Sequence, residues 1–124
     1  MDCIFCKIIN GEIPSKKIYE DDKAIVFMDI NPNIDGHCLI VPKKHYTDFK
    51  ELDDEIILHI EKIKREMTDK LMKKLNVNAM TISMNYGESQ IVKHVHIHLL
   101  PNFIVKMKPE KSVDEVYEIL KSED

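Results

Sequence analysis

The sequence predicts an α+β fold in which an antiparallel sheet packs against one long helix. Residues 51–75 carry apolar side chains three and four positions apart, the spacing of a helix with one apolar face. Several short β-rich runs elsewhere are separated by turn residues. Because these runs follow one another as in hairpins, we expect an antiparallel sheet. The 124 residues are enough for one domain and leave no room for a second core.

The N-terminal third predicts a short helix followed by three strands. The helix lies within residues 3–10 and ends at Gly11, with Pro14 preventing its continuation. Turn residues close each strand, and Pro42 ends the third because it has no amide hydrogen for a ladder. The expected strands are residues 17–20, 24–30 and 37–41.

The remaining elements follow the same reasoning. The helix at 51–75 ends at Asn76. A strand at 79–86 alternates, with Met80, Ile82 and Met84 on one face, and a strong strand at 92–100 ends at Pro101. Ser112 and Glu115 match a capping box that opens a last short helix at 113–121.

Composition excludes several classes of partner. The net charge is −4, no Lys/Arg run exceeds two residues, and no apolar stretch approaches the ~20 residues that a bilayer requires. We therefore expect no nucleic acid and no membrane. The segment MDCIFCKIING is too short and too soon interrupted for a secretory signal, so a cytoplasmic location is expected, with the three cysteines reduced.

Three histidines alternate in the predicted strand 92–100. His94, His96 and His98 would share one face, and the aliphatic residues between them would face the core. Same-face neighbours on a strand lie about 6.5–7 Å apart, so the rings form a row in which one metal could take two. A row favours chemistry by one ring that its neighbours orient. An exposed or core-satisfied set of histidines and an HxH metal site remain alternatives.

The segment HVHIHLL resembles the motif of the histidine triad (HIT) superfamily. The resemblance extends to CIFCKIINGEIPSKKIYEDD, FMDINP, GHCLIVPKKH, MNYG and QIVKHVHIHLLP, in the family's order. It covers residues 3–103, leaves 104–124 as a tail of a single domain 1–124, and is strongest to compact Hint-like and bacterial HIT proteins. It implies a five-stranded antiparallel sheet and a homodimer.

The resemblance also implies roles for individual residues. His96 would be the nucleophile that attacks the α-phosphorus of a nucleotide derivative, giving a nucleotidyl-histidine that water hydrolyses; no cofactor is needed for this chemistry. His98 would contact phosphate oxygens, and His94 and His37 would support the ring array. The nucleotide-binding set implied by the family is Asp29 on the ribose, Phe5, Ile8, Phe27 and Ile30 around a purine base, and Asn85 and Gln90 on the phosphate side.

One segment departs from the family pattern. The link from Asn85 to Gln90 is about two residues shorter than usual, Ser89 stands where glycine is common, and Ile91 replaces a hydroxyl residue. The loop that meets the leaving group is therefore altered, which affects substrate preference and turnover.

The cysteines suggest a metal site. Cys3 and Cys6 supply two thiolates, half of a zinc site. Zinc-containing HIT proteins resemble this chain, and their ligands correspond to Cys3, Cys6, His45 and His94, a structural site. Idle thiols are the alternative. Cys38 reads as a core residue and His59 as a surface residue.

Two hypotheses of function follow. The first is a hydrolase or transferase that cleaves nucleoside phosphoramidates or dinucleoside polyphosphates. The second is a module that binds purine nucleotides with little turnover. A metal hydrolase using an HxH pair ranks last, because no acidic third ligand stands near the triad in the sequence.

Overall fold

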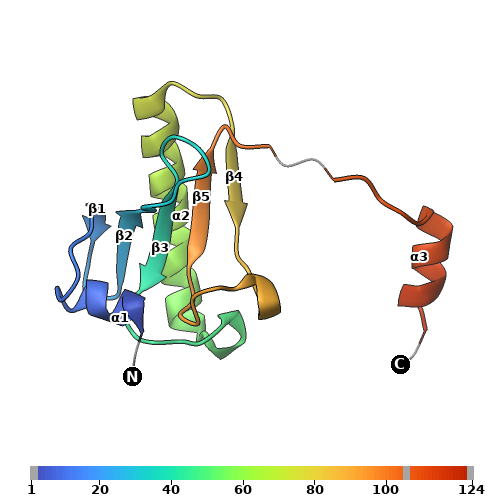
Figure 1. Cartoon of the computed structure of the whole chain (residues 1–124), viewed down its shortest axis with the longest axis horizontal. Helices are drawn as coiled ribbons and strands as arrows, with labels where there is room; N and C mark the ends of the chain where they lie inside the picture. The colour runs from blue at the N-terminus through green and yellow to red at the C-terminus, as the bar shows by residue number, and fades with distance from the viewer. Residues whose placement is uncertain (1–2, 105–106, 123–124) are drawn as a thin grey trace.

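One five-stranded antiparallel sheet forms the centre of the computed structural model, which describes residues 3–104 and 107–122 (Figure 1). Its strand order is β1-β2-β3-β5-β4. The elements in chain order are α1 (Ile4–Ile9), β1 (Lys17–Glu20), β2 (Ala24–Met28), β3 (Cys38–Pro42), the 3-10 helix η1 (Phe49–Glu51), α2 (Asp54–Leu75), β4 (Met80–Ser83), the 3-10 helix η2 (Gly87–Ser89), β5 (Ile97–Pro101) and α3 (Val113–Leu120). The predicted fold class is confirmed.

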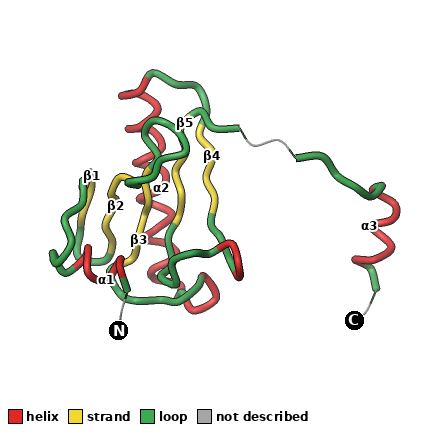
Figure 2. Tube along the Cα trace, in the orientation of Figure 1, coloured by secondary structure: helices red, strands yellow, loops and turns green. Residues whose placement is uncertain are grey.

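The central strands are buried on both faces. Ala24 and Val26 of β2 face α2, whereas Ile25 and Phe27, which alternate with them, face α1. The sheet is thus a middle layer between α2 and the short α1, as the tube view shows (Figure 2). This explains why β2 and β3 read as continuous apolar runs in the sequence rather than as alternating ones.

Helix α2 has defined ends. The Asp53 carboxylate accepts a hydrogen bond from the Ile56 amide at its start, and Asn76 ends it in the left-handed region at φ 54°. The expected start at residue 51 is therefore three residues early, because 49–51 form a separate 3-10 turn. The apolar face of α2 packs on β3 and β5 through Ile56, Ile60, Ile63, Met67 and Leu71.

Strand β5 begins at Ile97, five residues later than expected. Residues 92–94 form a bend, and residues 95 and 96 precede the ladder without pairing in it. The Val95 amide donates to the Tyr46 carbonyl at 2.8 Å instead, while the side chain of Val95 still enters the core. His94 and His96 therefore precede the strand, and His98 alone of the three lies within it.

The predicted face of β4 is only partly buried. Met80 packs against the α2 side of the core, whereas Ile82 and Met84 are 41% and 42% exposed. Strand β4 stands at the edge of the sheet, next to the point where the chain leaves for α3. Helix α3 begins with the expected capping box and lies beyond this edge, away from the sheet (Figure 1).

Among the described residues, no helix is both long and apolar enough to cross a membrane.

Asp21 joins the β1–β2 turn to α2. Its carboxylate accepts hydrogen bonds from the Lys23 and Ala24 amides, from the Tyr19 hydroxyl and from the His59 ring at 2.7 Å. Burial opposes the charged form, but these bonds outweigh it and lower the pKa of Asp21 to about 2. His59 is consequently half-buried with a carboxylate partner, not the surface residue that the sequence suggested.

We predict that Asp21→Ala lowers the free energy of unfolding by about 2–3 kcal/mol, because four donors lose one acceptor. Urea unfolding followed by circular dichroism measures this loss. Asp22→Ala, which removes the exposed neighbouring carboxylate, is the matched control and should change stability by less than about 0.5 kcal/mol. Equal losses in the two variants would contradict the assignment.

Candidate active site

A cleft of about 450 Å³ opens on the α1 side of the sheet. Its wall combines apolar side chains with imidazole, carboxylate and amide groups. Eight of the predicted site residues line it: Phe5, Ile8, Phe27, Asp29, Ile30, Asn85, His96 and His98. The structure does not bring His37, His94 or Gln90 to the cleft wall; these three are buried behind it.

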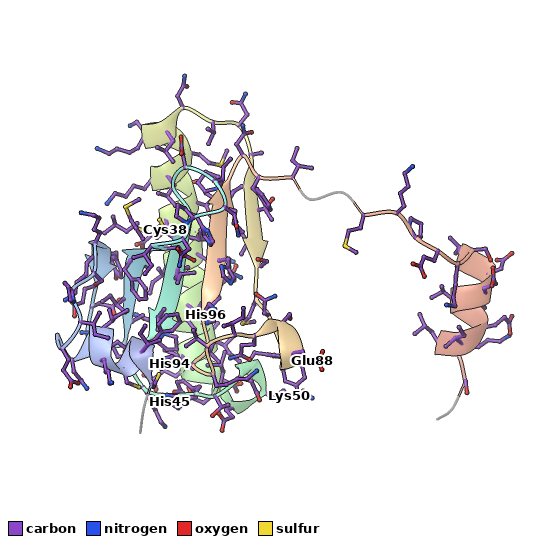
Figure 3. All side chains as sticks on the ribbon, viewed as in Figure 1. Cys38, His45, Lys50, Glu88, His94 and His96 are labelled. Carbon is purple, nitrogen blue, oxygen red and sulfur yellow. The ribbon has the colours of Figure 1, made fainter. Side chains whose placement is uncertain are left out.

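His96 is held by a backbone carbonyl. Its Nδ1 lies 2.8 Å from the His94 oxygen, and because a carbonyl only accepts, Nδ1 carries the hydrogen. The second ring nitrogen, Nε2, then has a free lone pair. The rings of His96 and His98 are 5.0 Å apart, so the two imidazoles stand together at the cleft. Figure 3 labels His96 and, near it, His94.

His98 is oriented through a chain of two hydrogen bonds that starts at a backbone amide. The Asn33 amide donates to His37 Nδ1 at 3.2 Å, which leaves the His37 hydrogen on Nε2. That hydrogen is donated to His98 Nδ1 at 2.9 Å. The remaining hydrogen of His98 is therefore on Nε2, and a neutral His98 offers a donor to a ligand.

The imidazole rings of His37, His94, His96 and His98 are neutral at pH 7. Burial lowers the pKa of His37, His94 and His96 below the ordinary value of 6.5. Burial, followed by the neighbouring His96 and His37 rings, lowers the pKa of His98 to about 4. Neutral imidazole is the form in which a ring nitrogen can act as a nucleophile.

Asp29 stands between a turn and the histidines. One carboxylate oxygen accepts from the Asn31 amide at 2.8 Å, and the other lies 3.6 Å from His37 Nε2. The side chain is 21% exposed and lines the cleft. It is therefore both the turn acceptor and a carboxylate open to a polar ligand.

Aromatic and aliphatic groups make up much of the cleft wall. Phe5 meets Phe27 edge-to-face at 5.5 Å and His96 at 5.0 Å with an interplanar angle of 90°. Helix α1 thus brings Phe5 directly against the His96 ring. Ile30, by contrast, is 85% exposed at the rim.

Gln90, in the loop between β4 and β5, was expected to bind the nucleotide but does not line the cleft. The Gln90 side chain turns inward, and its amide donates to the Thr47 and Val92 carbonyls at 2.6 and 3.0 Å. Ser89 and the highly exposed Ile91 line the cleft in its place. A glutamine next to a histidine motif reads as a ligand-binding group in a sequence, and only the structure shows that its amide fastens the loop.

A second hollow, of about 430 Å³, adjoins the cleft. The two share Ile4, Ile91 and Val92 in their walls, and the hollow continues to Thr47 and Lys93. The sequence did not indicate this second hollow, because its wall is formed by three segments that are far apart in the chain.

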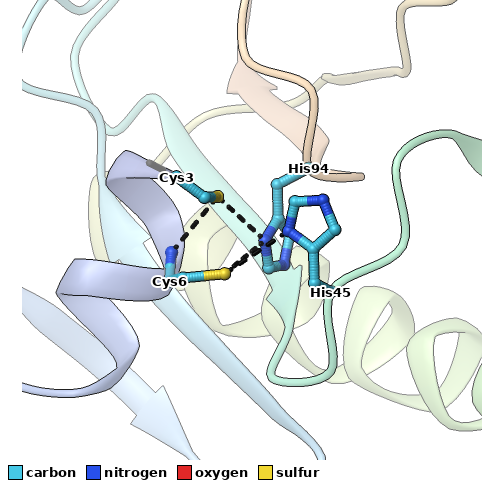
Figure 4. Close-up of side chains that lie close together, drawn as sticks. All are labelled: Cys3, Cys6, His45 and His94. Atoms are coloured by element: carbon cyan, nitrogen blue, oxygen red, sulfur yellow. Dashed lines mark hydrogen bonds between the residues drawn. The ribbon is translucent and has the colours of Figure 1, made fainter. Parts of the chain in front are cut away.

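The four predicted metal ligands, Cys3, Cys6, His45 and His94, lie close together (Figure 4). Cys3 Sγ and Cys6 Sγ are 3.4 and 3.5 Å from His94 Nδ1, Cys6 Sγ is 3.4 Å from His45 Nδ1, and all four ligand atoms lie within 4.8 Å of one another. Tetrahedral zinc with two sulfur and two nitrogen ligands has ligand atoms about 3.3–3.8 Å apart. The donor set therefore fits zinc.

His94 has the hydrogen-bond pattern of a metal ligand. Its Nε2 donates to the Pro42 carbonyl at 2.7 Å, so the lone pair is on Nδ1, which points to the two sulfur atoms. Such a bond from the outer nitrogen to a carbonyl commonly orients metal-bound imidazoles.

Asp29, His37 and His98 form a second cluster that does not fit a metal. Their ligand atoms lie within 4.8 Å, so a carboxylate does stand near the triad, although it is distant in the sequence. The 2.9 Å separation of His37 Nε2 and His98 Nδ1 is that of a hydrogen bond, and His37 Nδ1 already accepts from Asn33. No lone pair of His37 is left for an ion.

Comparisons with known proteins find relatives over most of the chain. The family model described as HIT domain matches residues 10–104. An uncharacterized HIT-like protein of Methanocaldococcus jannaschii is 46% identical, over 96% of each chain. The adenosine 5'-monophosphoramidase hnt1 of Schizosaccharomyces pombe is 37% identical over 82% of this chain and 74% of its own. A solved HIT family structure from Bacillus subtilis matches 97% of this chain and 93% of its own, with 30% identity and a TM-score of 0.85.

We predict that the protein loses stability as pH falls from about 6.5 to about 4, with His98 contributing. In this window the unfolded chain protonates His98, whereas the folded chain, with its pKa of about 4, does not. The loss ends below that pKa. Urea unfolding at a series of pH values compares the wild type with His98→Asn, which keeps an acceptor for His37 but does not titrate. The variant should lose less stability across the window; equal losses would contradict the role of His98.

Proposed function

This chain belongs to the HIT domain family, and from that premise we propose that it hydrolyses purine nucleoside phosphoramidates or related nucleotide derivatives at the α-phosphate. The observation that carries the proposal is the pair of neutral rings at the cleft, His96 with a free Nε2 lone pair and His98 with an Nε2 hydrogen. One can attack phosphorus while the other donates to a phosphate oxygen. A relative named adenosine 5'-monophosphoramidase supports this substrate class.

The first step would form a bond from His96 Nε2 to the α-phosphorus and break the bond from phosphorus to the leaving group. The ring becomes positively charged as its lone pair is used. The His94 carbonyl, which already accepts the Nδ1 hydrogen, stabilises that charge. His98 donates to a phosphate oxygen, and the departing amine or phosphate takes its proton from water.

The second step would transfer the nucleotidyl group to water. The bond from His96 Nε2 to phosphorus breaks, the water loses a proton to solvent, and the products are a nucleoside monophosphate and the original neutral ring. Neither step requires a metal, because positioning and charge stabilisation carry most of phosphoryl transfer.

Substrate binding would follow the polarity of the cleft. Asp29 offers a carboxylate oxygen to ribose hydroxyls, and the apolar wall around Phe5 and Phe27 suits a flat base. Beyond the phosphate, the cleft adjoins the hollow over Ile91. We therefore expect leaving groups with an apolar portion to be preferred.

The second candidate function is nucleotide binding with little turnover. Its support is the β4–β5 loop, in which the Gln90 amide is bound to backbone carbonyls and Ile91 offers no polar group. A protein of this kind would hold a nucleoside monophosphate without releasing an intermediate quickly.

We also propose that Cys3, Cys6, His45 and His94 hold a structural zinc ion, as the fit of the four ligand atoms supports. Zinc would fix the thiolates and keep the His94 ring immobile. Because Cys3 and Cys6 flank Phe5, and the His94 carbonyl holds His96, these residues tie both walls of the reactive pocket to one point.

The test of function is incubation with adenosine 5'-phosphoramidate and chromatographic detection of AMP. We predict release of AMP by the wild type and a roughly 1,000-fold or greater loss in His96→Ala, since the nucleophile is gone. His59→Ala, a histidine outside the cleft, is the control and should retain the rate. AMP binding by calorimetry without AMP release would favour the binding module, and full activity of His96→Ala would overturn the nucleophile.

We predict one zinc per chain by elemental analysis of protein purified without chelator. A chelator should lower the melting temperature, because metal binding stabilises the folded state. Cys6→Ser should lose the metal, whereas Cys38→Ser should keep it, since Cys38 is buried in the core away from the cluster. Zinc far below one per chain, together with a melting temperature that chelator does not change, would leave Cys3 and Cys6 as ordinary thiols.

A further inference from the structure

Two of the three free cysteines form a pair whose sulfur atoms share a neighbour. Cys3 Sγ and Cys6 Sγ lie 3.4 and 3.5 Å from the same atom, His94 Nδ1, and within 4.8 Å of each other (Figure 4). The third cysteine, Cys38, is 1% exposed and packs in the core on the opposite, α2 side of the sheet. Only Cys3 and Cys6 are therefore placed to react with each other.

The position of this pair on the main chain suits a disulfide bond. Cys3 is the N-cap of α1, and Cys6 lies three residues later, in the first turn of the helix. Residues at this separation have α-carbons about 5 Å apart, inside the range of about 4.4–6.8 Å that disulfides span. The Cys6 amide already donates to Cys3 Sγ at 3.4 Å, which holds the Cys3 side chain beside the first turn. Joining the two sulfur atoms therefore requires little movement of the main chain.

The hollow of about 430 Å³ next to the cleft gives small molecules access to the pair. Cys3 and His45 both line this hollow, and Cys6 is itself only partly buried. Hydrogen peroxide is only slightly larger than water, so a hollow of this size admits it easily. Susceptibility of a cysteine to oxidation depends on such access and on a second thiol nearby. Cys3 and Cys6 meet both conditions, whereas the buried Cys38 meets neither.

We propose that Cys3 and Cys6 form a peroxide-sensitive dithiol, which closes to a disulfide and opens again with a thiol reductant. The Cys3 thiolate attacks one oxygen of the peroxide, the O–O bond breaks, and a sulfenic acid forms with release of hydroxide. The Cys6 thiolate then attacks the Cys3 sulfur, the S–O bond breaks, and a second hydroxide leaves. The two sulfur atoms lose two electrons, the peroxide gains them, and two protons from solvent convert the hydroxides to water.

Closure of the disulfide would remove two of the four ligand atoms of the cluster, because the thiolate is the form that binds metal. Release of zinc therefore rests on the zinc site proposed above, whereas the disulfide requires only the two sulfur atoms. Phe5 stands between the two cysteines and meets the His96 ring at 5.0 Å. Loss of the link from α1 to His45 and His94 should consequently loosen one wall of the cleft and weaken nucleotide binding.

Peroxide treatment of the full chain, purified without chelator, tests the dithiol. Trypsin releases residues 1–7 as one peptide that contains both cysteines. After a small molar excess of hydrogen peroxide, this peptide should resist alkylation and weigh about 2 Da less than the reduced peptide. A colorimetric metal indicator should report release of the bound zinc in step with the disulfide. Dithiothreitol with added zinc should restore the original mass, the metal and the melting temperature.

Single variants identify the part that each cysteine plays. Cys6→Ser leaves Cys3 without a second thiol, so dimedone, which reacts with sulfenic acids, should label Cys3 in this variant. Cys3→Ser should label far less at Cys6, and Cys38→Ser should form the disulfide as the wild type does.

A wild-type peptide that gains oxygen atoms, or stays unchanged, instead of losing about 2 Da would overturn the dithiol. Zinc that stays bound after the disulfide has formed would overturn the coupling to the metal. A disulfide in protein that never held zinc would support the dithiol and remove only the zinc site.

Discussion

Burial of neutral imidazoles is the constraint on which the site depends. A buried ring has one donor and one acceptor, and each needs a partner of the opposite kind, since unpaired polar groups are costly away from water. Here backbone groups supply those partners: the Pro42 and His94 carbonyls accept, and the Asn33 amide donates. Each bond fixes which nitrogen carries the hydrogen. The backbone groups behind the cleft therefore decide which ring nitrogen is a donor and which is an acceptor.

This arrangement is possible because the two faces of the sheet are covered by different elements. Helix α2 fills one face with aliphatic side chains, so the other face is free for α1 and the cleft. Residues 95, 97 and 99 belong to the α2 side, which directs His96 and His98 to the opposite side. His94 lies deeper, at the N-terminal end of α1, where it faces the two cysteines. One segment with alternating side chains thus contributes to the core, to the cleft and to the cluster of cysteines and histidines.

Side-chain chemistry was far easier to predict from the sequence than backbone pairing. Apolar periodicity indicated α2 and the central strands, and histidine alternation indicated the face on which His96 and His98 line the cleft. The expected start of β5 at residue 92 was wrong because the alternation of side chains does not show where ladder bonds begin: residues 92–94 form a bend, and the Val95 amide donates to the Tyr46 carbonyl. The same limit applies to Gln90, whose inward turn depends on the Thr47 carbonyl 43 positions away. The hydrogen bonds that set the ring tautomers involve main-chain atoms, which every residue type shares, so no pattern of letters reveals them.

The Asn33 amide has a consequence for sequence variation. It begins the chain of bonds that leaves a hydrogen on the cleft nitrogen of His98, yet it belongs to the main chain. Any amino acid except proline supplies the same N–H. Position 33 is therefore free to drift among nineteen residue types in evolution or in a saturation library. Proline alone would leave His37 free to reverse its tautomer, which would turn the ligand-facing donor of His98 into an acceptor.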